Sequence, residues 1–211
     1  MRRIALYYLP LAVTAAMVAA CSTSDGDISQ SVTDSASATT DAPSNAATRP
    51  TLTASQLQPP SQVDEYTRSS GRPQVAFDPC TWIPDEAVTR AGFDPRSRKR
   101  GDDQVAEITF LICNFSAKNK TLTVMSGNAT WDEDSQKNGS WSEPLTINGR
   151  EARWVRDPAL KRGCDIHLRT RSGFVDIGVT LTADGVIDGM KPCDGLETAA
   201  SEIEPAIGKD N

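Results

Sequence analysis

The sequence predicts an α+β fold: an antiparallel β-sheet on which a short N-terminal helix and a C-terminal helix pack, cross-linked by two disulfides. Short segments between residues 108 and 181 alternate apolar and polar side chains, as strands do. Apolar residues at helical spacing occur before and after this region. All cysteines except Cys21 lie beyond residue 72, and their even number is typical of a disulfide-bonded exported domain.

The first helix is expected to begin at Pro84 and to end before Gly92. Proline is favoured at the first position of a helix, acidic residues in its first turn, and glycine just after its end. Pro84, Asp85 and Glu86 meet the first two conditions, and Gly92 meets the third. We therefore predict a short helix ahead of the sheet.

Four segments predict the sheet. Residues 108–113 are apolar on both faces, which is typical of a central strand, and residues 121–125 alternate threonine with leucine and valine. Residues 145–156 form a hairpin around Asn148-Gly149, the dipeptide that favours a type I′ turn. Residues 164–181 form a second hairpin that turns at a Ser-Gly dipeptide. The closing helix is expected over residues 194–207, where apolar side chains recur at helical spacing.

The four downstream cysteines occupy two kinds of position. Cys80 and Cys193 each follow a proline just before a predicted helix, whereas Cys113 and Cys164 lie on or at the start of predicted strands. The simplest connectivity joins each helix start to a strand, Cys80 with Cys113 and Cys164 with Cys193. Sequence alone leaves all three pairings open. No C-x-x-C pair occurs among them, so we favour disulfides over a zinc site.

The N-terminal segment predicts export. Arg2 and Arg3 precede an uncharged run over residues 4–20, which fits a signal peptide; Pro10 argues against the alternative, a retained membrane helix. The residues that end this run, Val18-Ala19-Ala20-Cys21, resemble the bacterial lipoprotein signal. That resemblance implies cleavage after residue 20 and acylation of Cys21, for example with palmitate. Two or more acyl chains would anchor the protein to the cell membrane on its extracytoplasmic face.

The remaining chain divides into a tether and one domain. Residues 21–72 are rich in serine, threonine and alanine, and we expect them to form a disordered, lipidated tether. Residues 73–211 have the length of a single domain, which we expect to be monomeric. The chain has a formal net charge of −6 at pH 7, so we expect no nucleic-acid partner, and membrane contact through the lipid alone.

Residues 75–207 resemble a known family. The features that carry the resemblance are Phe77-Asp78-Pro79-Cys80, Gly92-Phe93-Asp94-Pro95, Cys113, Asn148-Gly149-Arg150, Cys164 and Pro192-Cys193. They are similar to the four-cysteine cell-envelope lipoproteins of actinobacteria, of mycobacterial type, which are catalogued as a domain of unknown function. One departure is Phe115, where the family more often has tryptophan. The resemblance implies an envelope lipoprotein without an established activity.

No catalytic residue is assigned from the sequence. His167 and Asp165 share one face of a predicted strand, since residues two apart point the same way. No nucleophile motif such as G-x-S-x-G accompanies them. Arg169 and Arg171 continue this face, and we interpret it as a solvated polar surface.

No metal or cofactor is predicted either. Residues 134–139 have oxygen ligands before a glycine, as in a calcium loop, but Leu145 stands where such a loop needs glutamate. Weak calcium binding stays an alternative. We favour a long acidic surface loop.

Two places are candidates for binding a partner, an unidentified protein or polymer of the envelope. Trp131 and Trp141 flank the predicted acidic loop, and exposed tryptophans anchor partners; the alternative is that they pack against the sheet edge. A basic cluster in a second predicted loop has cations that suit phosphate or carboxylate groups; the alternative is a solvated loop near Asp102 and Asp103. Its members are Arg96, Arg98, Lys99 and Arg100.

Three classes of function remain. A binding or accessory module needs only a rigid domain and an anchor, and it is the favoured class. A carrier of a lipid or other apolar ligand is the alternative, and a sizeable apolar cavity would favour it. A hydrolase is the weakest candidate, and converging carboxylates in a cleft would favour it.

Overall fold

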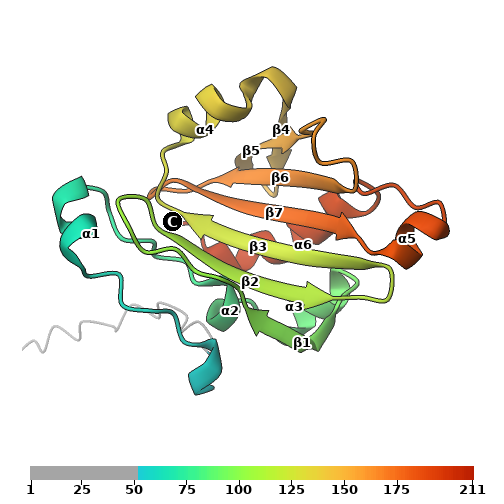
Figure 1. The fold of residues 1–211 in the computed structure, drawn as a ribbon, viewed down its shortest axis with the longest axis horizontal. Helices are drawn as coiled ribbons and strands as arrows, with labels where there is room; N and C mark the ends of the chain where they lie inside the picture. Colours follow the sequence, from blue (N-terminus) through green and yellow to red (C-terminus); the bar gives the residue numbers. More distant parts are fainter. Residues whose placement is uncertain (1–51) are drawn as a thin grey trace, which may run out of the picture. The chain divides into compact units, whose positions relative to one another are not determined.

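The computed structural model describes residues 52–211 (Figure 1). The predicted signal peptide, Cys21 and the tether up to residue 51 lie outside the described residues. Within residues 52–211, no helix is both long enough and apolar enough to cross a membrane.

Seven antiparallel strands form a single sheet in the order β1-β2-β3-β7-β6-β5-β4. The predicted fold class is therefore confirmed. The strands are β1 (Asp94–Arg100), β2 (Phe110–Ser116), β3 (Lys120–Gly127), β4 (Ser142–Ile147), β5 (Arg150–Val155), β6 (Gly163–Arg169) and β7 (Phe174–Leu181).

Helices cover one face of the sheet almost completely. Figure 1 shows α2, α3 and α6 behind the sheet, whereas α4 lies along one margin and α5 at one end of the strands. The helical segments are η1 (Ser55–Leu57), α1 (Glu65–Ser70), α2 (Pro79–Trp82), α3 (Asp85–Arg90), α4 (Trp131–Asn138), η2 (Gly139–Trp141), α5 (Ala183–Ile187) and α6 (Leu196–Ile207).

Alternation along the strands divides the sheet into two unlike faces. Leu122, Val124, Ile166 and Ile177 point toward the helices and are fully buried, as is Ile203 of α6. Burying each such side chain contributes roughly 1.5–3 kcal/mol. The opposite face, called the open face below, carries the other half of each alternating set.

Both disulfides have the favoured pairing. Cys80 of α2 is bonded to Cys113 of β2, and Cys164 of β6 is bonded to Cys193, three residues before α6. Each bond thus fixes a helix start to the helical face of the sheet. The loops they close span 33 and 29 residues, which the chain-entropy model converts to about 3–4 kcal/mol each.

The hairpins and the outer helices match their predictions closely. Asn148 and Gly149 have φ values of 50° and 87°, the left-handed conformation that a type I′ turn requires. Gly92 ends the α3 segment with φ 86°, and α6 begins at Leu196 rather than Asp194.

The predicted basic loop is wrong, because Asp94–Arg100 is the edge strand β1. It pairs with β2 through a register shift, with Asp94 opposite Ser116 and Lys99 opposite Asn114. Its residues do not alternate apolar with polar side chains, so the sequence pattern did not indicate a strand. Charged residues and irregular pairing are common at sheet edges, where they discourage strand addition.

The predicted tether extends too far, because residues 52–72 contain ordered structure. Leu57 is buried, and the Arg100 guanidinium donates through Nε to the Leu57 carbonyl at 3.0 Å. The Leu52 amide donates to the Thr81 carbonyl at 2.9 Å. A capping box of Asp64 and Thr67 begins α1. The serine- and threonine-rich composition concealed these few anchoring contacts.

Loss of one disulfide should lower stability without any help from metal. We expect Cys164→Ala with Cys193→Ala to lower the free energy of unfolding by about 3 kcal/mol. That corresponds to a Tm roughly 10 °C lower. Calorimetry of the full chain checks this, with chelator treatment as the control, which should shift the Tm by about a degree at most. A large loss in chelator alone would contradict the prediction.

Candidate functional site

A cavity of about 510 Å³ lies between α4 and the open face of the sheet. This size is within the range of small-molecule sites. Strands β2 and β3 supply its apolar side through Phe110, Ile112 and Met125. Strands β6 and β7 supply ionisable groups. The cavity therefore has an apolar wall on β2 and β3 and a polar wall on β6 and β7.

The register of the sheet explains this change across the cavity. Ile112 lies opposite Met125, Met125 opposite Asp176, Asp176 opposite His167, and His167 opposite Arg153. Residues directly opposite in an antiparallel sheet project to the same face. One row of side chains therefore runs from two apolar groups into three ionisable ones.

His167 is the centre of the ionisable wall. It is only 5% exposed. Its Nδ1 lies 2.9 Å from Asp134 Oδ1 of α4, its Nε2 lies 3.8 Å from Asp176 Oδ1, and its ring stacks on Phe174 at 4.8 Å. Our interpretation of this strand face as solvated is therefore wrong at His167, which α4 covers, whereas Arg169 and Arg171 farther along the chain are exposed.

Asp165 and Asp176 face each other across Gly178. A β-carbon at residue 178 would clash with Asp165 Oδ1 and would lie 3.5 Å from Asp176 Oδ1. The glycine thus makes room for both carboxylates on neighbouring strands. Asp176 Oδ1 is buried without a hydrogen-bond donor among residues 52–211.

Burial and charge together set the protonation of this wall. Burial and the nearby Asp176 raise the pKa of Asp165 to about 7. Burial also raises the pKa of Asp176, although the charge of His167 opposes this. Burial lowers the pKa of His167, but Asp176 and Asp134 raise it more, so its net pKa is raised. The imidazolium form is therefore favoured.

Asp134 is the anionic partner of that imidazolium. Burial raises the pKa of Asp134, but the hydrogen bond and charge of His167 lower it more, with help from Asn138 and Arg153, so its net pKa is lowered. The carboxylate is 1% exposed and receives 2.8 Å and 2.9 Å contacts from Asn138 and His167. This pair joins α4 to the sheet.

Further contacts hold α4 over the open face. The Arg153 guanidinium lies 3.6 Å from the centroid of the Trp131 ring and donates to Ser135 Oγ at 2.6 Å. At the start of the helix, Thr130 and Glu133 form a capping box. Glu133 is also ion-paired with Arg72 at 2.5 Å.

The predicted acidic loop and its calcium alternative are both wrong, because this segment is the helix α4 followed by η2. The capping box and the acidic first turn stabilise a helix here, so Asp134 turns toward His167 instead of a metal. Among residues 52–211, no group of three or more His, Cys, Asp or Glu side chains is arranged to hold a metal ion.

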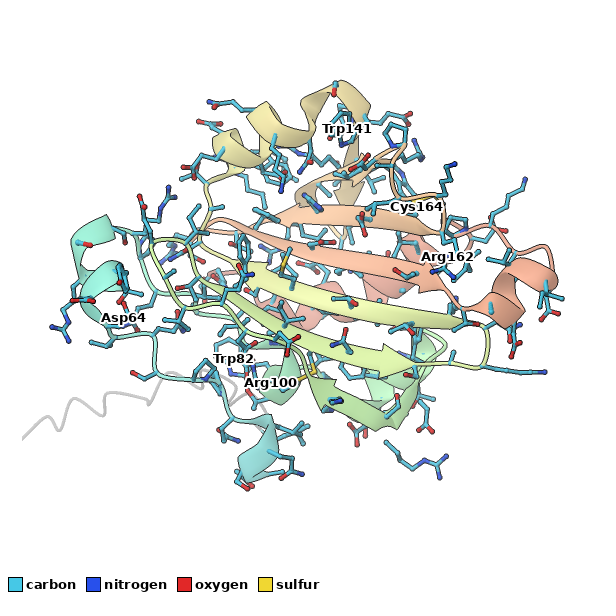
Figure 2. The ribbon with its side chains drawn as sticks, in the orientation of Figure 1. Asp64, Trp82, Arg100, Trp141, Arg162 and Cys164 are labelled. Carbon is cyan, nitrogen blue, oxygen red and sulfur yellow. A yellow bond between two sulfur atoms is a disulfide. The ribbon has the colours of Figure 1, made fainter. Side chains whose placement is uncertain are left out.

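The two predicted partner-binding tryptophans are both half-buried. Trp131 stacks on Arg153, and its indole Nε1 donates to Glu151 Oε1 at 2.9 Å. Trp141 lies beyond the end of α4 (Figure 2), and its indole nitrogen is buried without a hydrogen-bond partner in the described part of the chain. Trp131 therefore packs against the sheet, on side chains of β5, which is the alternative to an exposed partner-binding tryptophan.

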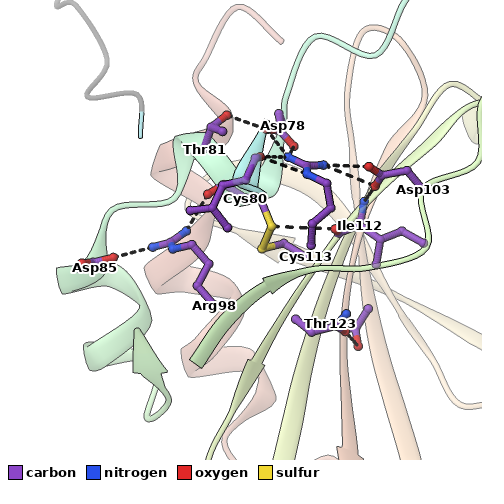
Figure 3. Close-up of a disulfide and its surroundings, with 12 residues drawn as sticks. Asp78, Cys80, Thr81, Asp85, Arg98, Asp103, Ile112, Cys113 and Thr123 are labelled. Carbon is purple, nitrogen blue, oxygen red and sulfur yellow. Dashed lines mark hydrogen bonds and ion pairs between the residues drawn. A yellow bond between two sulfur atoms is a disulfide. The ribbon is translucent and has the colours of Figure 1, made fainter. Parts of the chain in front are cut away.

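The members of the basic cluster on β1 have different surroundings, and Figure 3 shows Arg98 directed at Asp85. Arg98 donates to Asp85 Oδ1 at 2.6 Å and is 4% exposed in its side chain. Arg100 is paired with Asp78 and Asp103 at 2.7 Å and 3.1 Å. Arg96 and Lys99 point to solvent, and Arg96 is paired with Asp94. The four cations do not converge, so this anion site is not assembled.

Sequence reasoning missed three residues of the site: Asp134, Arg153 and Asp176. Two signals were present. The Thr130-x-x-Glu133 pattern is that of a capping box and predicts a helix start. Asp176 interrupts an otherwise apolar strand, and the register of the β6–β7 hairpin places it opposite His167.

The fold and cavity define an α+β domain with a small-molecule-sized site on the open face of its sheet. Residues 16–206 match a family described as a protein of unknown function, DUF3558, and the chain belongs to this family. No curated protein and no solved structure matches the chain.

Replacing Asp165 by asparagine should change how stability depends on pH. The folded carboxyl keeps its proton up to about pH 7, whereas an unfolded aspartate loses it near its ordinary pKa of 3.8. Asp165 therefore lowers the free energy of unfolding as the pH rises through that interval. We expect the Tm of Asp165→Asn, relative to the unaltered chain, to increase between about pH 4 and about pH 8.

Thermal unfolding at several pH values checks this expectation. Glu197→Gln is the matched control, because it removes one carboxylate from an exposed position on α6, behind the opposite face. It should not reproduce the increase expected for Asp165→Asn. A Tm difference for Asp165→Asn that stays constant with pH would contradict the assigned protonation.

Proposed function

We propose that this chain is a lipid-anchored protein of the actinobacterial cell envelope, on the extracytoplasmic side, that binds a small and partly apolar ligand. The cavity under α4 carries the proposal, since its volume and its two unlike walls are those of a ligand site. The two disulfides support an oxidising compartment. The lipoprotein-like Val18-Ala19-Ala20-Cys21 segment and the family resemblance support the anchor and its setting.

The chemistry of the lining favours binding over covalent hydrolysis. Among the described residues that line the cavity there is no serine, threonine or cysteine to act as a nucleophile. Both ring nitrogens of His167 are directed at carboxylates, so the imidazole is engaged in positioning α4. The carboxylates converge as a hydrolase would need, but they lie beside an apolar wall that suits retention of a ligand.

The role that follows is that of a binding or carrier module. An apolar ligand is sheltered between helix and sheet, and the anchor keeps the domain at the membrane surface. An accessory role toward another envelope component is compatible with the same cavity. This combines the favoured class of function with its carrier alternative.

Anchoring should depend on one sulfur. We expect Cys21→Ala to move the protein from the membrane fraction to the soluble fraction, or to leave it unprocessed, because acylation needs the thiol. Fractionation followed by intact-mass measurement checks this. Ser22→Ala is the neighbouring control and should remain anchored. If Cys21→Ala is still cleaved and still membrane-bound, the lipoprotein assignment fails.

Binding should depend on the apolar wall. We expect the full chain with Cys21→Ala to bind Nile red, and Ile112→Ser to weaken that binding about tenfold, since the apolar contact between the isoleucine side chain and the dye is lost. Ile187→Ser is the matched control, because Ile187 is 81% exposed on α5, outside the cavity. Fluorescence titration measures both. Equal weakening by the two variants would contradict the cavity as the binding site.

A further inference from the structure

The cavity wall holds more carboxylates than cations. Glu133 is paired with Arg72, and Asp134 is paired with His167. After these pairs are set aside, three acidic groups face the cavity against one lysine: Asp157, Asp165 and Asp176 against Lys137. A ligand that brings a positive charge would balance this wall.

Gly178 allows two of these carboxylates to approach each other, because Asp165 Oδ1 occupies the space where a β-carbon of residue 178 would lie and Asp176 Oδ1 is 3.5 Å from that point. The Asp165 carboxylate makes no hydrogen bond or ion pair within residues 52–211. Asp176 Oδ1 is buried, without a donor, and its nearest cation is His167 Nε2 at 3.8 Å. Two incompletely satisfied carboxylates that lie close together and both line the cavity form a receptor for a compact cation with several N–H donors.

The apolar wall at the other end of the cavity determines which kind of group can be attached to that cation. Ile112 and Met125 continue the cross-strand row beyond Asp176, and Phe110 lies next to them at the start of β2. An apolar chain or ring bound along β2 and β3 would remain in contact with this wall while its charged end reached Asp176. The order of groups along the row therefore matches an amphiphile with a cationic end.

We propose that the cavity binds a protonated amine attached to an apolar body, with the ammonium between Asp165 and Asp176 and the body against Ile112 and Met125. This inference rests on the proposed binding function and names the ligand class for the same cavity. A free alkylamine and the amine headgroup of a lipid share this chemistry. A neutral or anionic amphiphile of equal length lacks the group that the two carboxylates recognise.

Binding of an amine should therefore vary with pH. Asp165 is faced by His167 on its own strand, Asp176 on β7, Asp157 in the β5–β6 loop, and Asp134 and Lys137 on α4. Its proton must leave before it can accept an ammonium at full strength. Because the pKa of Asp165 is raised to about 7, affinity for the amine should increase as the pH rises through neutrality.

Calorimetric titration of the full chain with Cys21→Ala tests the proposal, using n-octylamine, n-octanol and n-octanoate as probes of one length. At about pH 8 we expect octylamine to bind about tenfold more tightly than octanol, with octanoate weakest. At about pH 5.5 the preference for octylamine should largely disappear. Asp165→Asn should remove the preference at both values, whereas Glu197→Gln should keep it.

The outcomes separate the two proposals. If octanol and octanoate bind as tightly as octylamine at about pH 8, the ammonium site is overturned and the apolar cavity stands. If none of the three probes binds, the binding function itself fails. If Asp165→Asn does not fold, the pH series on the chain with Asp165 tests the role of this residue. A preference for octylamine over octanol that does not change with pH would overturn that role. The length of the apolar body distinguishes the two sources of the amine. If the protein also binds n-butylamine more tightly than n-butanol, the ammonium site is assigned to a free amine rather than to a lipid headgroup.

Discussion

The bond between Asp134 and His167 determines the shape of the site, because it links helix α4 to strand β6 on the open face of the sheet. A charged pair that is almost fully buried is costly to separate, since either partner left alone would lack both water and counter-charge. The pair thereby fixes the distance between α4 and the sheet. The cavity is the space that this distance leaves between the helix and the apolar ends of β2 and β3.

Buried arginines play the same part on the other side of the domain. Arg98 extends from the edge strand to Asp85 of α3 (Figure 3), and Arg100 is paired with Asp78, which precedes α2, and with Asp103, which follows β1. Arg100 also donates to the Leu57 carbonyl, so the segment ahead of the sheet is held by the guanidinium that secures β1. Polar networks of this kind define a unique arrangement when every member has its partner.

Much of the fold was predictable from local pattern, and the missing parts share one physical cause. The β4–β5 and β6–β7 hairpins, α3 and α6 follow from apolar alternation, turn dipeptides and helix-end residues, which are signals carried within a short segment. The favoured disulfide pairing was one of three that the sequence left open, and the structure has it. In contrast, β1 and α4 have no apolar face that a sequence pattern could reveal. Ion pairs with residues elsewhere in the chain help to hold both elements in place. Asp165 and His167 were correctly placed on one face, but Asp134 contacts His167 from 33 residues away in sequence. Such a contact leaves no trace in a window of ten residues.

The irregular pairing of β1 has a consequence for how this domain can meet other proteins. Between Asp94 and Lys99 its register with β2 shifts, and its outward side chains are charged. At the other margin, β4 carries Pro144, which has no amide hydrogen to offer. Neither edge presents the unbroken row of donors and acceptors that an incoming strand requires. Addition of a partner's β-strand to either edge of the sheet is therefore disfavoured. A partner would have to bind the side chains on the surface of this domain.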